Sequence, residues 1–123
     1  MKLFGKSADA ITSKIIFHAS TLGIPERQQL GKASLSSKGF KLHIAKTAKY
    51  DEFFLHIPLD HISNLRTFQK KTYSSVFYVI QIDFRNENDR PAMVSCEIRV
   101  FFRRGQALLT VKEWKRLYKK LTT

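Results

Sequence analysis

The strongest periodic pattern in the chain lies between residues 109 and 121, where apolar side chains recur at the spacing of an α-helix. On such a helix one face carries Val111, Trp114, Leu117, Tyr118 and Leu121. The other face carries Lys112, Lys115, Arg116, Lys119 and Lys120. The pattern predicts an amphipathic helix whose apolar face is buried and whose cationic face points to solvent.

Most of the other segments alternate between apolar and polar residues, which is the pattern of half-buried antiparallel strands. In residues 94–103 the apolar positions, Cys96 among them, take one face, while polar residues such as Glu97 take the other. Residues 75–84 are rich in β-branched and aromatic side chains, and the polar stretch 85–91 joins the two segments. These two segments are predicted to pair as a long hairpin.

A second hairpin is predicted upstream, where residues 32–36 and 39–45 flank a Ser-Lys-Gly turn. Residues 53–57 alternate in the same way, and Pro58 restricts this segment to the edge of a sheet or ends it. Residues 62–67 are predicted to continue as a strand after a bend.

The N-terminal segment allows two interpretations. Ser7 is a suitable cap for a helix that carries Ile11 and Ile15 and stops at Gly23. Residues 14–19 also match a strand. We favour a helix that leads into a strand.

At 123 residues the chain is long enough to close one hydrophobic core. We expect an N-terminal extension over residues 1–13, helical in the favoured interpretation, and a single domain over residues 14–123. Strand after strand followed by one helix indicates a mainly β (α+β) fold. About seven antiparallel strands would form a barrel or two near-orthogonal sheets, and the apolar face of the helix fits the open end.

Three segments of this arrangement resemble the pleckstrin-homology-like (PH-like) superfold. Residues 111–117 (Val-Lys-Glu-Trp-Lys-Arg-Leu) resemble its closing helix, in which a Trp packs into the barrel. Residues 57–62 (Ile-Pro-Leu-Asp-His-Ile) are similar to a strand ending seen in several branches, and residues 31–42 look like one of its hairpins. The resemblance spans residues 14–121 and implies about seven antiparallel strands in two near-orthogonal sheets, capped by a C-terminal helix.

The sequence departs from the lipid-binding branch of that superfold. It lacks the Gly-hydrophobic-Leu-x-Lys opening strand, the W-x-x-R-W/F-like strand and a basic signature of the K-x(n)-R-x-R kind. Specific phosphoinositide recognition is therefore not carried over from the resemblance. The phosphotyrosine-binding branch is a second candidate relative because a helix can precede its strands, but no residue match supports it.

Lysine and arginine outnumber aspartate and glutamate by 22 to 10, which gives a formal net charge of +12. Such an excess attracts polyanions, so the candidate partners are an anionic membrane surface, a nucleic acid and an acidic protein segment. The alternative is that the charge serves only solubility. A single Cys, with no signal-peptide or membrane-spanning pattern, predicts an intracellular location, whether cytoplasmic, peripheral to a membrane or nuclear.

The sequence offers little for catalysis or metal binding. The four histidines, His18, His43, His56 and His61, have neither the spacing nor the cysteine and carboxylate neighbours of a metal site. Cys96 fits a small buried apolar residue better than a nucleophile. The acids near the second hairpin, Asp83, Glu87, Asp89 and Glu97, fit surface ion pairs better than a general acid/base pair. No phosphate-binding loop or nucleophile elbow occurs, so we expect no enzyme, no cofactor and no metal.

Four groups of basic residues remain as candidate anion-binding sites. The first, around the upstream hairpin, contains Lys38, Lys41, Lys46 and Lys49. The second, in a predicted loop, contains Arg66, Lys70 and Lys71. The third, on and after the last long strand, contains Arg99, Arg103 and Arg104. The fourth consists of the five helix cations, and each group can equally be a solvated face.

Phe68 and Tyr73 lie among the cations of the second group. Aromatic side chains in this setting suit base stacking or insertion between lipid headgroups. We favour the simpler interpretation, in which both side chains anchor the loop to the core.

Three functions fit these features. The leading hypothesis is a non-enzymatic recognition or adaptor module whose basic surface docks an acidic membrane surface or a phosphoinositide. The first alternative is a nuclear or nucleoprotein module that binds nucleic acid or an acidic protein segment. The second alternative is a protein-protein interaction domain that takes up a peptide at the edge strand near Pro58.

Overall fold

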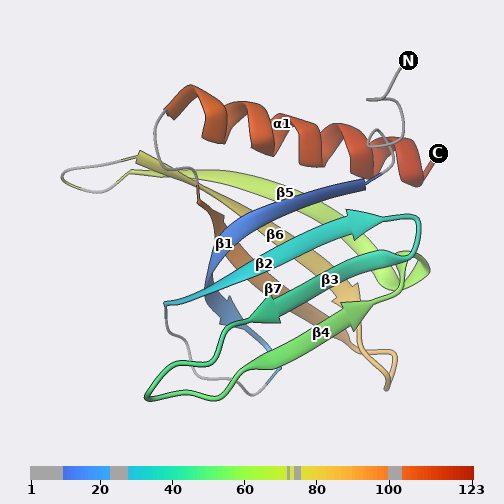
Figure 1. Ribbon diagram of the computed structural model, residues 1–123. Helices are drawn as coiled ribbons and strands as arrows, with labels where there is room; N and C mark the ends of the chain where they lie inside the picture. The colour runs from blue at the N-terminus through green and yellow to red at the C-terminus, as the bar shows by residue number, and fades with distance from the viewer. Residues whose placement is uncertain (1–9, 23–27, 72, 74–75, 100–103) are drawn as a thin grey trace.

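The computed structural model describes residues 10–22, 28–71, 73, 76–99 and 104–123 (Figure 1). The first four strands are β1 (Ala10–Ser20), β2 (Gln29–Ser36), β3 (Gly39–Ile44) and β4 (Phe53–Ile57). A short 3-10 helix, η2 (Leu59–His61), leads into β5 (Ile62–Lys71), β6 (Val76–Arg85) and β7 (Pro91–Ile98). The α-helix α1 (Arg104–Leu121) follows.

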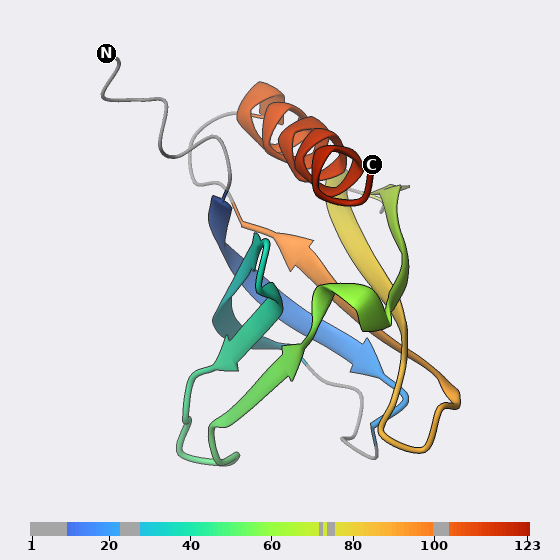
Figure 2. The ribbon, with the colours of Figure 1, turned by 90° about the vertical axis from the view of Figure 1, so that its right-hand side faces the viewer.

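The strands form one antiparallel sheet of seven, in the order β4-β3-β2-β1-β7-β6-β5. β1 lies at the centre and pairs with β2 on one side and β7 on the other. The sheet curves around its inner face, and α1 lies across the open end (Figure 2). The predicted mainly β class, with about seven antiparallel strands and a closing helix, is confirmed. The predicted edge position of residues 53–57 is also confirmed, because β4 and β5 form the two edges.

The core lies between the inner face of the sheet and α1. Alternate residues of the strands supply it, and Phe40 and Trp114 are among its largest fully buried side chains. Trp114 is 0% exposed, and its indole Nε1 donates a hydrogen bond to Ser13 Oγ at 2.9 Å. Its ring centroid lies 6.1 Å from that of Phe40. The indole therefore joins the closing helix to both β1 and β3.

α1 has the amphipathic character that the sequence predicts. Its buried and partly buried apolar residues are Val111, Trp114, Leu117, Tyr118 and Leu121. Its exposed basic residues are Lys112, Lys115, Arg116, Lys119 and Lys120. The helix begins at Arg104 rather than at Leu109, so Gly105 lies in its first turn. A glycine weakens a helix without forbidding it, and here it does not act as a break.

Both predicted hairpins are present, and each turn has a local cause. Gly39, at the β2–β3 turn, has φ of 113°. A Cβ atom at this position would stand 2.1 Å from the carbonyl oxygen of Ile57, so the turn and the approach of β4 both require glycine. At the β6–β7 turn, Asn86 Oδ1 accepts hydrogen bonds from the backbone N–H groups of Asn88 and Arg90, at 2.9 and 3.1 Å.

The helix predicted to carry Ile11 and Ile15 is wrong, because both residues lie in β1. β1 pairs with β2 and, over its second half, with β7, and Ile15 and Phe17 face the core. β-branched residues favour a strand when neighbouring strands are there to pack against. Ser7 and Gly23, the predicted cap and stop, lie outside the described residues.

The loop predicted around residues 66–71 is also wrong, because β5 continues to Lys71. The segment pairs residue by residue with β6, as far as Lys71 opposite Val76. Phe68 and Tyr73 do not anchor a loop to the core, since both side chains are exposed. The lysines of residues 66–71 suggested a loop, but regular pairing with β6 stabilises this segment as a strand.

The last strand overlaps the predicted segment, residues 94–103, only in part. β7 runs from Pro91 to Ile98, so it begins before the predicted start. Arg99 still donates its backbone N–H to the carbonyl oxygen of Lys14, at 2.9 Å. Residues 100–103 lie outside the described residues.

Candidate anion-binding face

The outer face of β1 to β4 carries two rows of side chains that follow the strand register. Successive side chains of a strand point to opposite faces, so the residues that alternate with the core positions lie here. The first row is Thr12, Ser34, Lys41 and His56. The second row is Lys14, Lys32, His43 and Phe54. These eight residues are called the outer grid below.

An open hollow of about 470 Å³ lies over this part of the sheet. The residues that line it include Lys32, Ser34, Lys41, His43 and Phe54, together with Leu42 and Leu55. Basic, hydroxyl-bearing and aromatic residues therefore border one depression. This combination suits a ligand that carries both negative charge and a flat ring.

Phe54 is the most exposed side chain with an apolar ring on this face, at 70% of its maximal surface. Its ring stacks on the His43 imidazole, with 4.3 Å between centroids and 4° between planes. His43 Nε2 in turn contacts Glu52 Oε2 at 2.8 Å. The Phe54 ring is thus held in a defined orientation although most of it faces solvent.

Lys32 and Lys41 are both exposed. In the part of the chain that the structure describes, neither forms an ion pair with a carboxylate. Lys14 lies directly opposite Lys32 across the β1–β2 pair. Like charges in such positions repel each other. The outer grid therefore concentrates positive charge on neighbouring strands.

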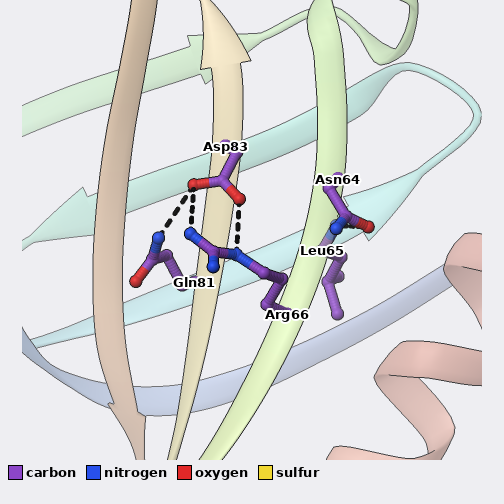
Figure 3. A network of polar contacts seen from close by, with 5 residues as sticks. All are labelled: Asn64, Leu65, Arg66, Gln81 and Asp83. Atoms are coloured by element: carbon purple, nitrogen blue, oxygen red, sulfur yellow. Dashed lines mark hydrogen bonds and ion pairs between the residues drawn. The ribbon is translucent and has the colours of Figure 1, made fainter.

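The outer face of β5 to β7 is arranged differently, because it carries paired charges, and Figure 3 shows the network around Asp83. Arg66 Nε donates to Asp83 Oδ2 at 2.7 Å, and Gln81 Nε2 donates to Asp83 Oδ1 at 2.8 Å. Burial raises the pKa of Asp83, but the hydrogen bonds from Arg66 and Gln81 and the charge of Arg66 outweigh it, so the net pKa is lowered. A neighbouring pair joins His18 Nε2 to Glu97 Oε1 at 3.1 Å.

The predicted ion pairs are confirmed for three of the four acids, and the buried thiol is confirmed. Asp83 and Glu97 pair as described above, and Asp89 contacts Arg85 at 3.5 Å, whereas Glu87 forms no ion pair in the described parts of the chain. Cys96 is buried, and burial raises the pKa of its thiol to about 12. A thiol with such a pKa stays protonated near neutral pH and is a poor nucleophile.

The basic residues predicted from the sequence do not converge on one face. Lys41 belongs to the outer grid, whereas Lys38 lies in the β2–β3 turn and Lys46 and Lys49 lie in the β3–β4 connection. In the second group, Arg66 is paired with Asp83 and Lys70 and Lys71 end β5. Arg99 follows β7, beside Lys14 of β1, while Arg103 and the side chain of Arg104 lie outside the described parts. The helix cations lie on α1, where Arg116 contacts Glu113 at 3.5 Å.

Most residues of the outer grid could not be recognised as a binding surface from the sequence. Lys14, Lys32, His43, His56 and Phe54 were not assigned to a binding surface, although each occupies a polar position of an alternating strand. The missing information was the pairing register, which places these residues side by side. A predicted register for the β2–β3 hairpin would have brought Lys32 beside His43 and Ser34 beside Lys41.

Among the described residues, no three His, Cys, Asp or Glu side chains are placed to hold a metal ion. No helix in the described ranges combines the length and apolar character needed to cross a membrane. The sequence matches no protein-family model and no curated protein. The geometry and charge of the outer grid are therefore the main guide to function.

Proposed function

We propose that the protein is a non-enzymatic recognition module that docks a phosphate-bearing partner on the outer grid. The observation that carries this proposal is the placement of Lys32 and Lys41 on adjacent strands, exposed and with no carboxylate paired to either in the described residues. Ammonium groups and the hydroxyls of Thr12 and Ser34 are suitable donors to phosphate oxygens. The net charge of +12 would speed the encounter with any such partner.

The seven-stranded antiparallel sheet and its closing helix are compatible with the PH-like superfold, and we include that assignment in the proposal. It favours an acidic membrane surface or a phosphoinositide as a source of phosphate. A nucleic acid backbone offers the same chemistry. We expect the module to act in an intracellular compartment, where both are available.

The double variant Lys32→Gln/Lys41→Gln tests the outer grid. It should weaken binding to a single-stranded oligonucleotide or to phosphatidylserine vesicles, whichever the wild type binds. For a single strand, the slope of log K against log salt should become shallower by about 0.7 for each phosphate that the lysines no longer neutralise. The matched control is Lys115→Gln/Lys119→Gln, which removes the same charge from the exposed face of α1.

Equal losses in the two double variants would mean that net charge alone attracts the partner. No retention of the wild type by any phosphate-bearing probe at near-physiological salt would overturn the proposal. Thermal unfolding should be similar in all three proteins, because exposed lysines contribute little to stability.

A further inference from the structure

We propose that the partner is a single-stranded nucleic acid, with one base stacked on Phe54 and the neighbouring phosphates over Lys32 and Lys41. This inference rests on the proposed function of the outer grid. It adds the class of partner and assigns a separate task to the aromatic ring.

The Phe54 side chain stands out on the outer grid because of its exposure. Phe54 is the second residue of the edge strand β4 and is 70% exposed, so it loses the stabilisation that burial would give it. One face of the ring stacks on His43 at 4.3 Å between centroids, and Glu52 contacts that imidazole at 2.8 Å. The other face of the ring is the platform on which an unpaired base would stack.

The lysines lie at a suitable distance from this platform. Phe54, His43 and Lys32 follow one another across β4, β3 and β2 in one register row, so Phe54 and Lys32 are about 10 Å apart at their backbones. Lys41 lies one row away, on the strand next to Phe54. A base stacked on Phe54 would leave its flanking phosphates within reach of flexible lysine side chains.

The carboxylate of Glu52, which contacts the grid, also fits this arrangement. Glu52 contacts His43 and precedes Phe54 by two residues, whereas Lys41 pairs with His56, two residues after Phe54. A phosphate beside Lys41 would therefore lie on the other side of the Phe54 row from Glu52.

Other phosphate-bearing partners fit the grid less well. Membrane binding strengthens with the apolar area that is inserted, whereas the large exposed apolar side chains on the outer face of β1 to β4 are Phe54 and Leu30, which lie on strands that are not adjacent. Reading of duplex DNA in the major groove needs a protruding helix or ribbon, and a four-stranded face does not enter a groove. Bases that are free to stack are available in a single strand.

The test compares two labelled oligomers of about 12 nucleotides, a length within the usual site sizes. One is a thymidine oligomer, and the other is an abasic oligomer with the same number of phosphates. Fluorescence anisotropy with the full chain is measured at roughly 50 and 200 mM salt. Phosphatidylserine vesicles serve as a third probe.

Phe54→Ala should weaken binding of the thymidine oligomer about tenfold and leave binding of the abasic oligomer unchanged. Lys32→Gln/Lys41→Gln should weaken both. The matched aromatic control is Phe68→Ala, which removes an exposed ring from β5 and should weaken neither. Melting temperatures of the variants report whether each one is folded.

The outcomes separate this inference from the proposed function. If Phe54→Ala binds thymidine as tightly as the wild type while the lysine variant is weakened, base stacking is wrong and the phosphate site stands. If the lysine variant is not weakened for any probe, both proposals fail. If vesicles bind and the thymidine oligomer does not, the partner is a membrane and the inference is overturned.

Discussion

The two halves of the outer sheet face differ in how their charged side chains are paired. On β5 and β6, Arg66 is bonded to Asp83, and on β7 Glu97 contacts His18 of the neighbouring strand β1. On β1 to β4, the exposed Lys32 and Lys41 have no carboxylate paired to them in the described residues. Both halves belong to one sheet and cover one core, so the difference does not come from the fold.

This contrast distinguishes charged side chains that stabilise the fold through ion pairs from charged side chains that remain available to bind a partner. A surface ion pair contributes up to about 1 kcal/mol to folding and leaves little charge for a partner. Lysines on neighbouring strands that lack such a pair contribute nothing of this kind to folding and leave their full charge to solvent. The β1 to β4 half is therefore the better place to expect an anionic partner, although basic residues occur on both halves.

The largest effect is expected from Trp114→Ala, which should unfold both halves together. Removing a buried Trp typically costs about 3 to 5 kcal/mol, a large share of the stability of a domain of this size. α1 contacts strands from both halves, so the loss should appear as one transition. Circular dichroism during thermal unfolding measures it.

Cys96 provides an independent measure of the same change. Its buried thiol should react slowly with a thiol reagent in the wild type and quickly in Trp114→Ala. Trp114→Phe is the control, because it keeps most of the packing and loses the hydrogen bond to Ser13, at a cost of about 1 kcal/mol. Wild-type stability in Trp114→Ala would mean that the helix does not close the core.

A smaller effect is expected when a carboxylate is added to the β1 to β4 half, so that it resembles the β5 to β7 half. Ser34→Glu places a carboxylate opposite Lys41, as Asp83 stands beside Arg66 in the other half. Binding of a single-stranded oligonucleotide should weaken about tenfold, equivalent to about 1.4 kcal/mol. Ser34→Gln matches Ser34→Glu in size, lacks its charge and keeps a hydrogen-bond donor in its side-chain amide, so it should bind more tightly than Ser34→Glu. Equal binding by the two variants would show that charge pairing does not distinguish the halves.

The converse change should affect stability and leave binding intact. Arg66→Gln removes one partner of the Asp83 network and should lower the free energy of unfolding by about 0.2 to 1 kcal/mol. Chemical denaturation measures this loss, and oligonucleotide titration should show wild-type affinity. A clear loss of affinity in Arg66→Gln would place part of the binding surface on β5.

The smallest effect concerns the pH dependence of the Asp83 network. The pKa of Asp83 is lowered in the folded state, so its ionised form contributes stability above the unfolded value near pH 4. That contribution is lost as the pH falls through the folded-state pKa. The difference in stability between wild type and Asp83→Asn should therefore shrink below about pH 4. If the difference in stability between wild type and Asp83→Asn stays constant with pH, the ionised form of Asp83 does not stabilise the fold.

Much of the fold could be predicted from alternation, because burial in a one-sided sheet imposes period two directly on the sequence. Residues 53–57 and 94–98 are examples, and the face of α1 around Trp114 follows the helical period in the same way. The N-terminal helix failed because Ser7 and Gly23 offered suitable ends for it. The segment is a strand because β1 pairs with a neighbouring strand on each side, which no local sequence pattern reveals.

The candidate site was harder to predict because it depends on register. Lys32 and His43 are neighbours through the β2–β3 hairpin, and Phe54 joins them through β4. Clusters of basic residues in the sequence drew attention to Arg66 and the helix instead. Those charges are adjacent along the chain, whereas the outer grid takes two residues from each of four strands.

The central position of β1 has a consequence for the order in which the sheet can assemble. Ile15 pairs with Gly31 of β2, which is close in the chain, and with Ile98 of β7, which is made much later. During synthesis the outer grid can form from β1 to β4 while the other edge of β1 is still unpaired, because β7 has not yet been made. We expect that late closure to limit the folding rate, since contacts distant in sequence form slowly. Until it occurs, the open edge of β1 is a site at which another chain could pair.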